Sequence, residues 1–168
     1  AVYLVVGFHS GTPKLGGGFI GVDVFFVISG FLITGLLLDE WQGSGRVDLW
    51  RFYARRARRL IPAGTVVIVS TALLYAFVAI PAERERAVDG ARSASWFFAN
   101  WRFVGQAQNY FTAKVTESPY LHFWSLSVEE QFYLLWPALL IGLMWWSRHR
   151  RRPHGSLVAA VVVLTVVA

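Results

Sequence analysis

Three long apolar stretches constrain the fold more than any other feature of this sequence. They are residues Phe19–Leu38, Ala63–Ile80 and Phe123–Trp146. A helix of about 20 apolar residues crosses the hydrocarbon core of a bilayer. Two shorter apolar stretches, Ala1–His9 and Ser156–Ala168, touch the chain ends, and each is too short to span alone. The pattern predicts an all-α, polytopic transmembrane helical bundle with three full spans and two partial spans at the chain ends.

The composition supports a membrane protein over a soluble domain. The chain is 55% hydrophobic and 15% charged, and it has no Cys. Soluble domains average about 45–50% apolar and about 25% charged residues. The absence of Cys excludes a disulfide scaffold and a thiolate metal site, and no other metal-binding cluster is visible in the sequence. Because apolar runs touch both chain ends, we expect residues 1–168 to be a fragment of a larger polytopic protein.

The basic residues predict the orientation of these spans. The formal net charge is +6. Segments 39–60 and 147–155 together hold ten basic and three acidic residues, whereas segments 11–20 and 81–122 hold six and four. Basic residues gather on cytoplasmic loops of membrane proteins, so we place the first pair of segments in the cytoplasm. In this setting the basic balance does not point to nucleic acid. The outer segment 81–122 carries an aromatic run at 95–103 that predicts an interfacial or re-entrant helix.

Two titratable residues lie near the outer ends of the first spans. An ionisable side chain at membrane depth is costly, and it marks a functional site by default. His9 suits general base work because its unperturbed pKa is near 6.5. Asp23 follows a Gly-rich turn that brings it back towards His9, where a carboxylate fixes the His tautomer. The alternatives are an interfacial His9 touching headgroups, and Asp23 as a carboxylate favourable to the helix dipole.

A basic cluster precedes the second full span. It consists of Arg55, Arg56, Arg58 and Arg59. On a helix, residues three apart are neighbours, so the cluster forms two pairs of guanidinium groups suited to bidentate phosphate binding. The alternative is that these arginines only anchor the span and set its topology.

The segment 121–137 enters the third span with unusual polarity. Glu129 and Glu130 are adjacent, and Ser125 lies on the Glu129 face at i, i+4, while Glu130 points about 100° away. His122, Gln131 and Tyr133 add further polar groups. A purely structural span does not need this polar density, so one carboxylate is expected to face a polar cavity.

Four ordered motifs, FHSG, GGGFIGVDVFFVISGFLIT, RFYARRARRLIPA and HFWSLSVEEQFYLLWP, closely resemble the acyltransferase 3 family of multi-pass bacterial membrane O-acyltransferases. The resemblance implies that the chain is the N-terminal part of a membrane acyltransferase domain, truncated at both ends. It implies catalytic roles for His9, Asp23, Glu129 and Glu130. It implies donor binding by Arg55, Arg56, Arg58 and Arg59. It further implies substrate binding by Ser29, His122, Trp124, Ser125, Gln131 and Tyr133.

The implied activity is transfer of an acyl group, expected to be acetyl, to a hydroxyl of a cell-surface glycan. The implied partners are acyl-CoA as donor substrate, the glycan acceptor and membrane lipid, with no metal and no nucleic acid. The implied location is the bacterial inner membrane. Two alternatives stay open at this point: a polytopic transporter or flippase, which also carries intramembrane charge and a kinked span, and a non-catalytic membrane fragment. Transfer or hydrolysis of acyl-CoA by the intact protein separates the first alternative from an acyltransferase.

Overall fold

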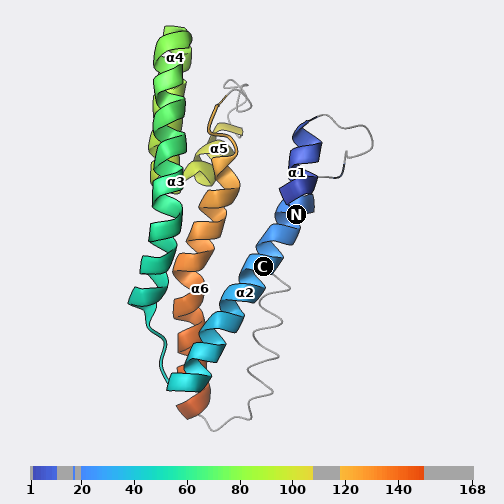
Figure 1. The fold of residues 1–168 in the computed structure, drawn as a ribbon, viewed down its shortest axis with the longest axis vertical. Helices are drawn as coiled ribbons and strands as arrows, with labels where there is room; N and C mark the ends of the chain where they lie inside the picture. The colour runs from blue at the N-terminus through green and yellow to red at the C-terminus, as the bar shows by residue number, and fades with distance from the viewer. Residues whose placement is uncertain (1, 11–16, 18–19, 108–117, 150–168) are drawn as a thin grey trace. The chain divides into compact units, whose positions relative to one another are not determined.

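The computed structural model describes residues 2–10, 17, 20–107 and 118–149, and every regular element in those residues is an α-helix. The helices are α1 (Val2–His9), α2 (Ile20–Ser44), α3 (Leu49–Val78), α4 (Pro81–Ser95), α5 (Ala99–Ala107) and α6 (Phe123–His149). Figure 1 shows them along the chain. The predicted all-α fold class is confirmed for this part of the chain.

Among the described residues, two helices, α2 and α3, are long and apolar enough to cross a membrane. They contain the first two predicted spans. The third predicted span is helical as α6, but its crossing of the membrane stays a prediction. The partial span at the N-terminus forms α1. The partial span at 156–168, the turn residues 11–16 and the basic segment 150–155 lie outside the described residues.

Helix α3 begins at Leu49, 14 residues before the predicted span at Ala63, and it includes the basic cluster that was expected on a helix. Asp48 starts the helix, because its side chain accepts a hydrogen bond from the Arg51 backbone amide at 2.9 Å. This N-cap satisfies one of the unpaired amides of the first turn. Pro62 lies inside the helix without ending it. The basic cluster and the apolar span therefore belong to one continuous helix of 30 residues.

The chain divides into two compact units. The first comprises Ala1–Val47 and Leu134–Ala168. Within it α1 packs against α2. A buried hydrogen bond joins α2 to the second half of α6, because the Trp136 indole donates to Thr34 Oγ1 at 2.8 Å. Within α2, the Thr34 hydroxyl donates to the Gly30 carbonyl at 2.7 Å. Buried polar groups that are paired in this way fix the register of the two helices.

The second unit is Asp48–Tyr133. Helix α4 returns antiparallel along the C-terminal half of α3 (Figure 1), and the two pack side by side. Ala87, Ala94 and Tyr120 form a buried cluster against which Ile68 and Tyr75 of α3 pack. Small residues on α4 permit this close approach of the two helices. The first half of α6 completes the unit.

Candidate functional site

Arg56 and the two adjacent glutamates of α6 form an ion-paired cluster in the second unit. Arg56 Nη2 donates to Glu130 Oε1 at 2.9 Å and lies 4.0 Å from Glu129 Oε1. The side chains of Arg56, Glu129 and Glu130 are 23%, 10% and 17% exposed. One guanidinium thus faces two largely buried carboxylates. Losing either partner of such a pair strands a charge away from water.

Tyr133 completes the cluster. The Arg56 guanidinium carbon lies 3.3 Å from the centroid of the Tyr133 ring, which is a cation–π arrangement. The Tyr133 hydroxyl donates to Glu129 Oε1, one turn earlier on α6. The Tyr53 hydroxyl, from α3, donates to the Tyr133 backbone carbonyl at 3.4 Å. Arg56 is therefore stacked on Tyr133 and ion-paired to Glu130 at the same time. A planar guanidinium can make both contacts, whereas a Lys ammonium is a point charge without a flat face.

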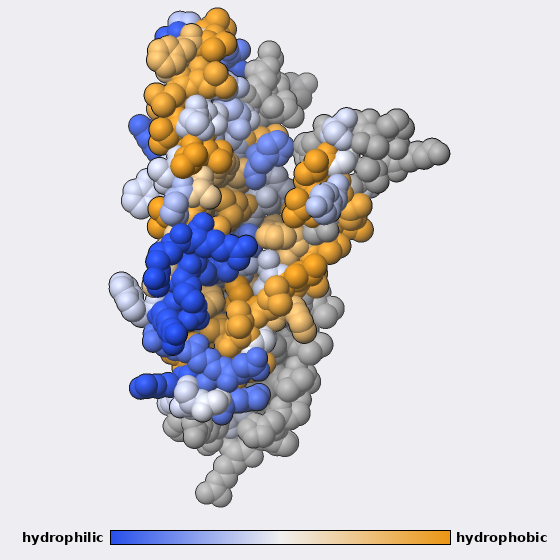
Figure 2. All heavy atoms as spheres, viewed as in Figure 1, coloured by the Kyte–Doolittle hydropathy of each residue, from blue (hydrophilic) through white to orange (hydrophobic). Residues whose placement is uncertain are grey.

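The remaining arginines of α3 form a separate surface. Arg51, Arg55, Arg58 and Arg59 are all exposed, and at 3.6 residues per turn they fall within about 100° of the helix circumference. We call these four residues the arginine stripe. Figure 2 shows hydrophilic side chains gathered over this part of the molecule. The predicted cluster is therefore split: Arg56 points to α6, and Arg51 joins the other three.

Gln131 connects α6 to the α4–α5 turn. Its Nε2 donates to the Phe97 carbonyl at 2.7 Å and to Asn100 Oδ1 at 3.0 Å, and its Oε1 accepts from Asn100 Nδ2 at 3.2 Å and from the Trp101 indole at 3.1 Å. One turn earlier, buried Ser127 accepts a hydrogen bond at 3.2 Å from the Ala99 amide, the first amide of α5. Both ends of the Gln131 amide are thus used within the chain.

A family model described as an acyltransferase domain matches residues 1–168. The chain belongs to this acyltransferase family. It is 42% identical over 150 residues to the peptidoglycan O-acetyltransferase OatA of Listeria monocytogenes, covering 89% of this chain and 24% of that protein. It is 37% identical over 163 residues to the O-acetyltransferase OatA of Staphylococcus aureus (strain NCTC 8325 / PS 47), covering 97% and 26%. No solved structure matches.

The acyltransferase chain spans about a quarter of the length of these curated relatives. The prediction that it is one part of a larger protein fits that share. Family membership does not favour the transporter alternative.

Three predicted site residues of the acyltransferase chain lie on α1 and α2, in the first unit. Asp23 is exposed in the first turn of α2, and Ser29 is half-buried two turns later. The backbone of His9 ends α1, but its side chain lies outside the described residues, so the pairing of His9 with Asp23 stays a prediction.

Three predicted substrate-binding residues surround the start of α6. His122 is exposed, Trp124 and Ser125 are half-buried, and the Ser125 hydroxyl donates to the His122 carbonyl at 3.3 Å. This bond caps the local turn. It assigns no substrate role to these residues, and their binding role stays a prediction.

One residue that organises the acyltransferase chain, Tyr120, was not singled out from the sequence. Tyr120 is fully buried, its hydroxyl donates to the Ile68 carbonyl at 3.0 Å, and burial together with the nearby Tyr75 raises its pKa above the ordinary value. Ser127 and Gln131 share one face of α6 at i, i+4. That spacing was visible in the sequence, whereas the partners of both side chains on α4 and α5 were not.

Proposed function

We propose that this chain forms the N-terminal part of a membrane-embedded O-acetyltransferase of bacteria. The whole protein transfers an acetyl group from acyl-CoA to a hydroxyl of a cell-wall glycan. The family match and the O-acetyltransferase activity for which the two relatives are named support acetyl transfer to such a glycan. The single observation that carries the choice of donor is the arginine stripe.

The arginine stripe is suited to the phosphate groups of coenzyme A. Its four guanidinium groups are exposed on one face of α3, immediately before the apolar part of the same helix. Planar guanidinium groups bind phosphate bidentately. The excess of basic residues on segment 39–60 supports a cytoplasmic location for this end of α3, on the side of the membrane where acyl-CoA is available. Arg56 is assigned a different role, because its guanidinium is already held by Glu130 and Tyr133.

The chemistry needs a base for the acceptor hydroxyl. In this proposal His9 accepts the hydroxyl proton, and Asp23 fixes the His9 tautomer. The hydroxyl oxygen forms a bond to the acetyl carbonyl carbon, the carbon–sulfur bond breaks, and the CoA thiolate takes up the proton that His9 releases. Arg56 is a positioning residue that holds Glu129 and Glu130 in the interior of the protein. The helices α2, α3 and α6 cross the bilayer, whose hydrocarbon core is about 30 Å thick. The acyl-pantetheine arm of the cytoplasmic donor therefore enters the helix bundle, so that its thioester meets the acceptor hydroxyl near His9.

The test uses the full-length protein in lipid vesicles, with soluble peptidoglycan fragments as acceptor. Acetyl-CoA and acetyl-pantetheine, which carries the thioester without any phosphate, are compared as donors. We expect acetyl-CoA to be used with a KM at least about 10-fold lower, because charge-assisted hydrogen bonds contribute about 1.5–3 kcal/mol each. Acetylation with neither donor would contradict an acyl-CoA-dependent reaction. Equal use of both donors would contradict the phosphate role of the arginine stripe.

Substitutions inside and outside the arginine stripe test whether the stripe binds the phosphates of acetyl-CoA. Arg55→Gln and Arg59→Gln should raise the KM for acetyl-CoA and leave the KM for acetyl-pantetheine unchanged. Arg84→Gln, on the opposite end of the α3–α4 pair, is the control and should change neither value.

A further inference from the structure

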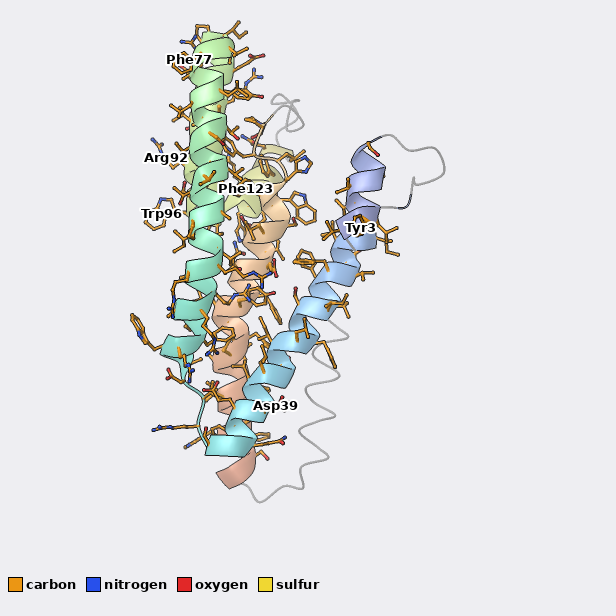
Figure 3. All side chains as sticks on the ribbon, in the orientation of Figure 1. Tyr3, Asp39, Phe77, Arg92, Trp96 and Phe123 are labelled. Atoms are coloured by element: carbon orange, nitrogen blue, oxygen red, sulfur yellow. The ribbon has the colours of Figure 1, made fainter. Side chains whose placement is uncertain are left out.

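Helices α3 and α4 lie side by side but expose different kinds of side chain: those of α3 are mainly apolar, and many of those of α4 are charged. Beyond Arg59, α3 exposes large apolar side chains on most of its circumference; these include Val66, Val67, Leu73, Leu74, Phe77 and Val78. Helix α4 exposes all of its charged side chains, which are Glu83, Arg84, Glu85, Arg86, Asp89 and Arg92. Arg92 and the neighbouring Trp96 point away from the helix pair (Figure 3). The pair is therefore apolar along one side and charged along the other.

Close packing fixes the depth of α4 relative to α3. Ala87, Gly90 and Ala94 form the buried face of α4. A methyl group added at Gly90 would lie 2.8 Å from a ring carbon of Tyr120, whose hydroxyl bonds to the Ile68 carbonyl in the middle of α3. The 15 residues of α4 extend about 22 Å at 1.5 Å per residue. Since α4 begins three residues after α3 ends, it runs beside the C-terminal half of α3 from Val78 back to about Gly64.

This arrangement restricts where the hairpin can lie. If it stood wholly in water, the apolar side of α3 would remain hydrated, at about 25 cal/mol for each Å² left unburied. If it were wholly surrounded by lipid, each charged residue of α4 would cost about 2.5–3.5 kcal/mol on insertion scales. Both costs are avoided when apolar surroundings cover α3 and water covers α4. Ionisable residues at membrane depth face such water-filled cavities.

We propose that α4 is a re-entrant helix that lies at membrane depth and lines a water-filled vestibule open to the outer face. The membrane depth of α3 and the outer side of α4 rest on the proposed function. The three acidic and three basic residues of α4 balance each other, so the vestibule suits a neutral, hydrophilic ligand such as a glycan chain.

The vestibule ends close to the α6 polar segment. After Ser95 the chain turns through Trp96 and Phe97 into α5, and Gln131 holds this turn through the Phe97 carbonyl. Phe97 has a φ of 54°, a backbone conformation that costs energy for a non-glycine residue and persists only when neighbouring contacts hold it. Gln131 is adjacent to Glu130, so a ligand moving along α4 arrives at the α6 segment that carries both glutamates.

The experiment compares single-cysteine variants that are matched for depth. The chain itself has no Cys, and the rest of the full-length protein is made Cys-free. Counting antiparallel from the α3–α4 turn pairs Glu85 with Leu74, and Arg92 with Val67. A charged, membrane-impermeant maleimide is added to intact cells whose walls have been removed enzymatically. Glu85→Cys and Arg92→Cys should react at least about 10-fold faster than Leu74→Cys and Val67→Cys. Asp39→Cys, on the cytoplasmic side, should react only after permeabilisation.

Three outcomes would overturn the vestibule. Equally fast reaction at both members of each pair would place the hairpin in water. Equally slow reaction at both members, even after permeabilisation, would show that α4 is covered. Reaction at Glu85→Cys and Arg92→Cys only after permeabilisation would place α4 on the cytoplasmic side. Arg86→Cys with Leu73→Cys serves as a replacement pair if a variant does not reach the membrane.

Acetyl transfer is assayed separately on the same Cys-free parent protein. If the labelling pattern is found but no acetyl transfer, the vestibule is supported and the proposed function is contradicted. If acetyl transfer is found without the labelling pattern, the proposed function is supported and the vestibule is contradicted.

Discussion

Arg56 and the arginine stripe lie on the same turns of α3 but have opposite environments. Arg56 is largely buried, ion-paired to Glu130 and stacked on Tyr133. Arg51, Arg55, Arg58 and Arg59 are exposed. A buried pair is sensitive to removal of one partner, whereas an exposed arginine contributes little to stability. Neighbouring residues of one type, in one motif, therefore occupy two environments: Arg56 is held inside the protein, and the four arginines of the stripe remain at the surface.

The largest expected difference between the two regions is in stability. Arg56→Ala leaves Glu129 and Glu130 without their cation and should lower the free energy of unfolding by about 3 kcal/mol. Arg59→Ala should change it by less than about 0.5 kcal/mol, as is usual for surface substitutions. Thermal unfolding of the purified full-length protein in detergent measures both. Equal melting temperatures for the two variants would contradict the distinction between Arg56 and the stripe.

The second difference concerns the donor. Arg55→Gln and Arg59→Gln should each raise the KM for acetyl-CoA by about 10-fold, because each loses a charge-assisted contact to phosphate. Raising the salt concentration should reproduce part of this effect in the parent protein, since exposed charges are screened. Initial rates at varied acetyl-CoA concentration provide the measurement. A donor KM that is independent of salt would count against the stripe.

A smaller effect on stability is expected from the hydrogen bond between Tyr133 and Glu129 in the buried cluster. Tyr133→Phe keeps the ring beneath the Arg56 guanidinium but removes the hydroxyl that donates to Glu129. We expect a loss of about 1 kcal/mol, which is typical of one hydrogen bond. Phe132→Tyr, at the neighbouring position, is the matched control. The same thermal unfolding assay detects the change, and an unaltered melting temperature for Tyr133→Phe would remove that hydrogen bond from the account.

Much of the helical architecture was predictable because it depends on local apolar runs. The sequence located α2, α3 and α6, since a long apolar run determines a helix largely by itself, and Pro137 inside the third run does not end α6. The predicted span at Ala63–Ile80 marks the apolar part of α3. The N-cap at Asp48 was not predicted, because the first part of this helix is polar and gives no hydropathy signal. The position of α4 beside α3 depends on long-range contacts of Gly90 and Tyr120, and no local pattern reports such contacts.

The site was predictable as a set of residues, but their pairing was not. The polarity of Glu129 and Glu130 in an apolar segment marked them as unusual, and the arginines were marked by their spacing. Helical periodicity alone could not show that Arg56, rather than Arg55 or Arg59, faces α6, because the rotation of α3 about its axis is set by tertiary packing. For the same reason, the hydrogen bonds of Gln131 to Phe97 of the α4–α5 turn and to Asn100 and Trp101 of α5 had no signal in the sequence.

A double-mutant cycle on Arg56 and Glu130 measures whether Arg56, unlike the exposed arginines of α3, is energetically coupled to the buried carboxylate. The free energy of unfolding is measured for the parent protein, Arg56→Gln, Glu130→Gln and the double variant, with Arg59 and Glu130 as the matched control cycle. We predict that the Arg56–Glu130 cycle shows a coupling energy above about 1.5 kcal/mol, whereas the control cycle is additive within about 0.5 kcal/mol. Additive effects in both cycles would contradict the assignment of Arg56 to the buried cluster.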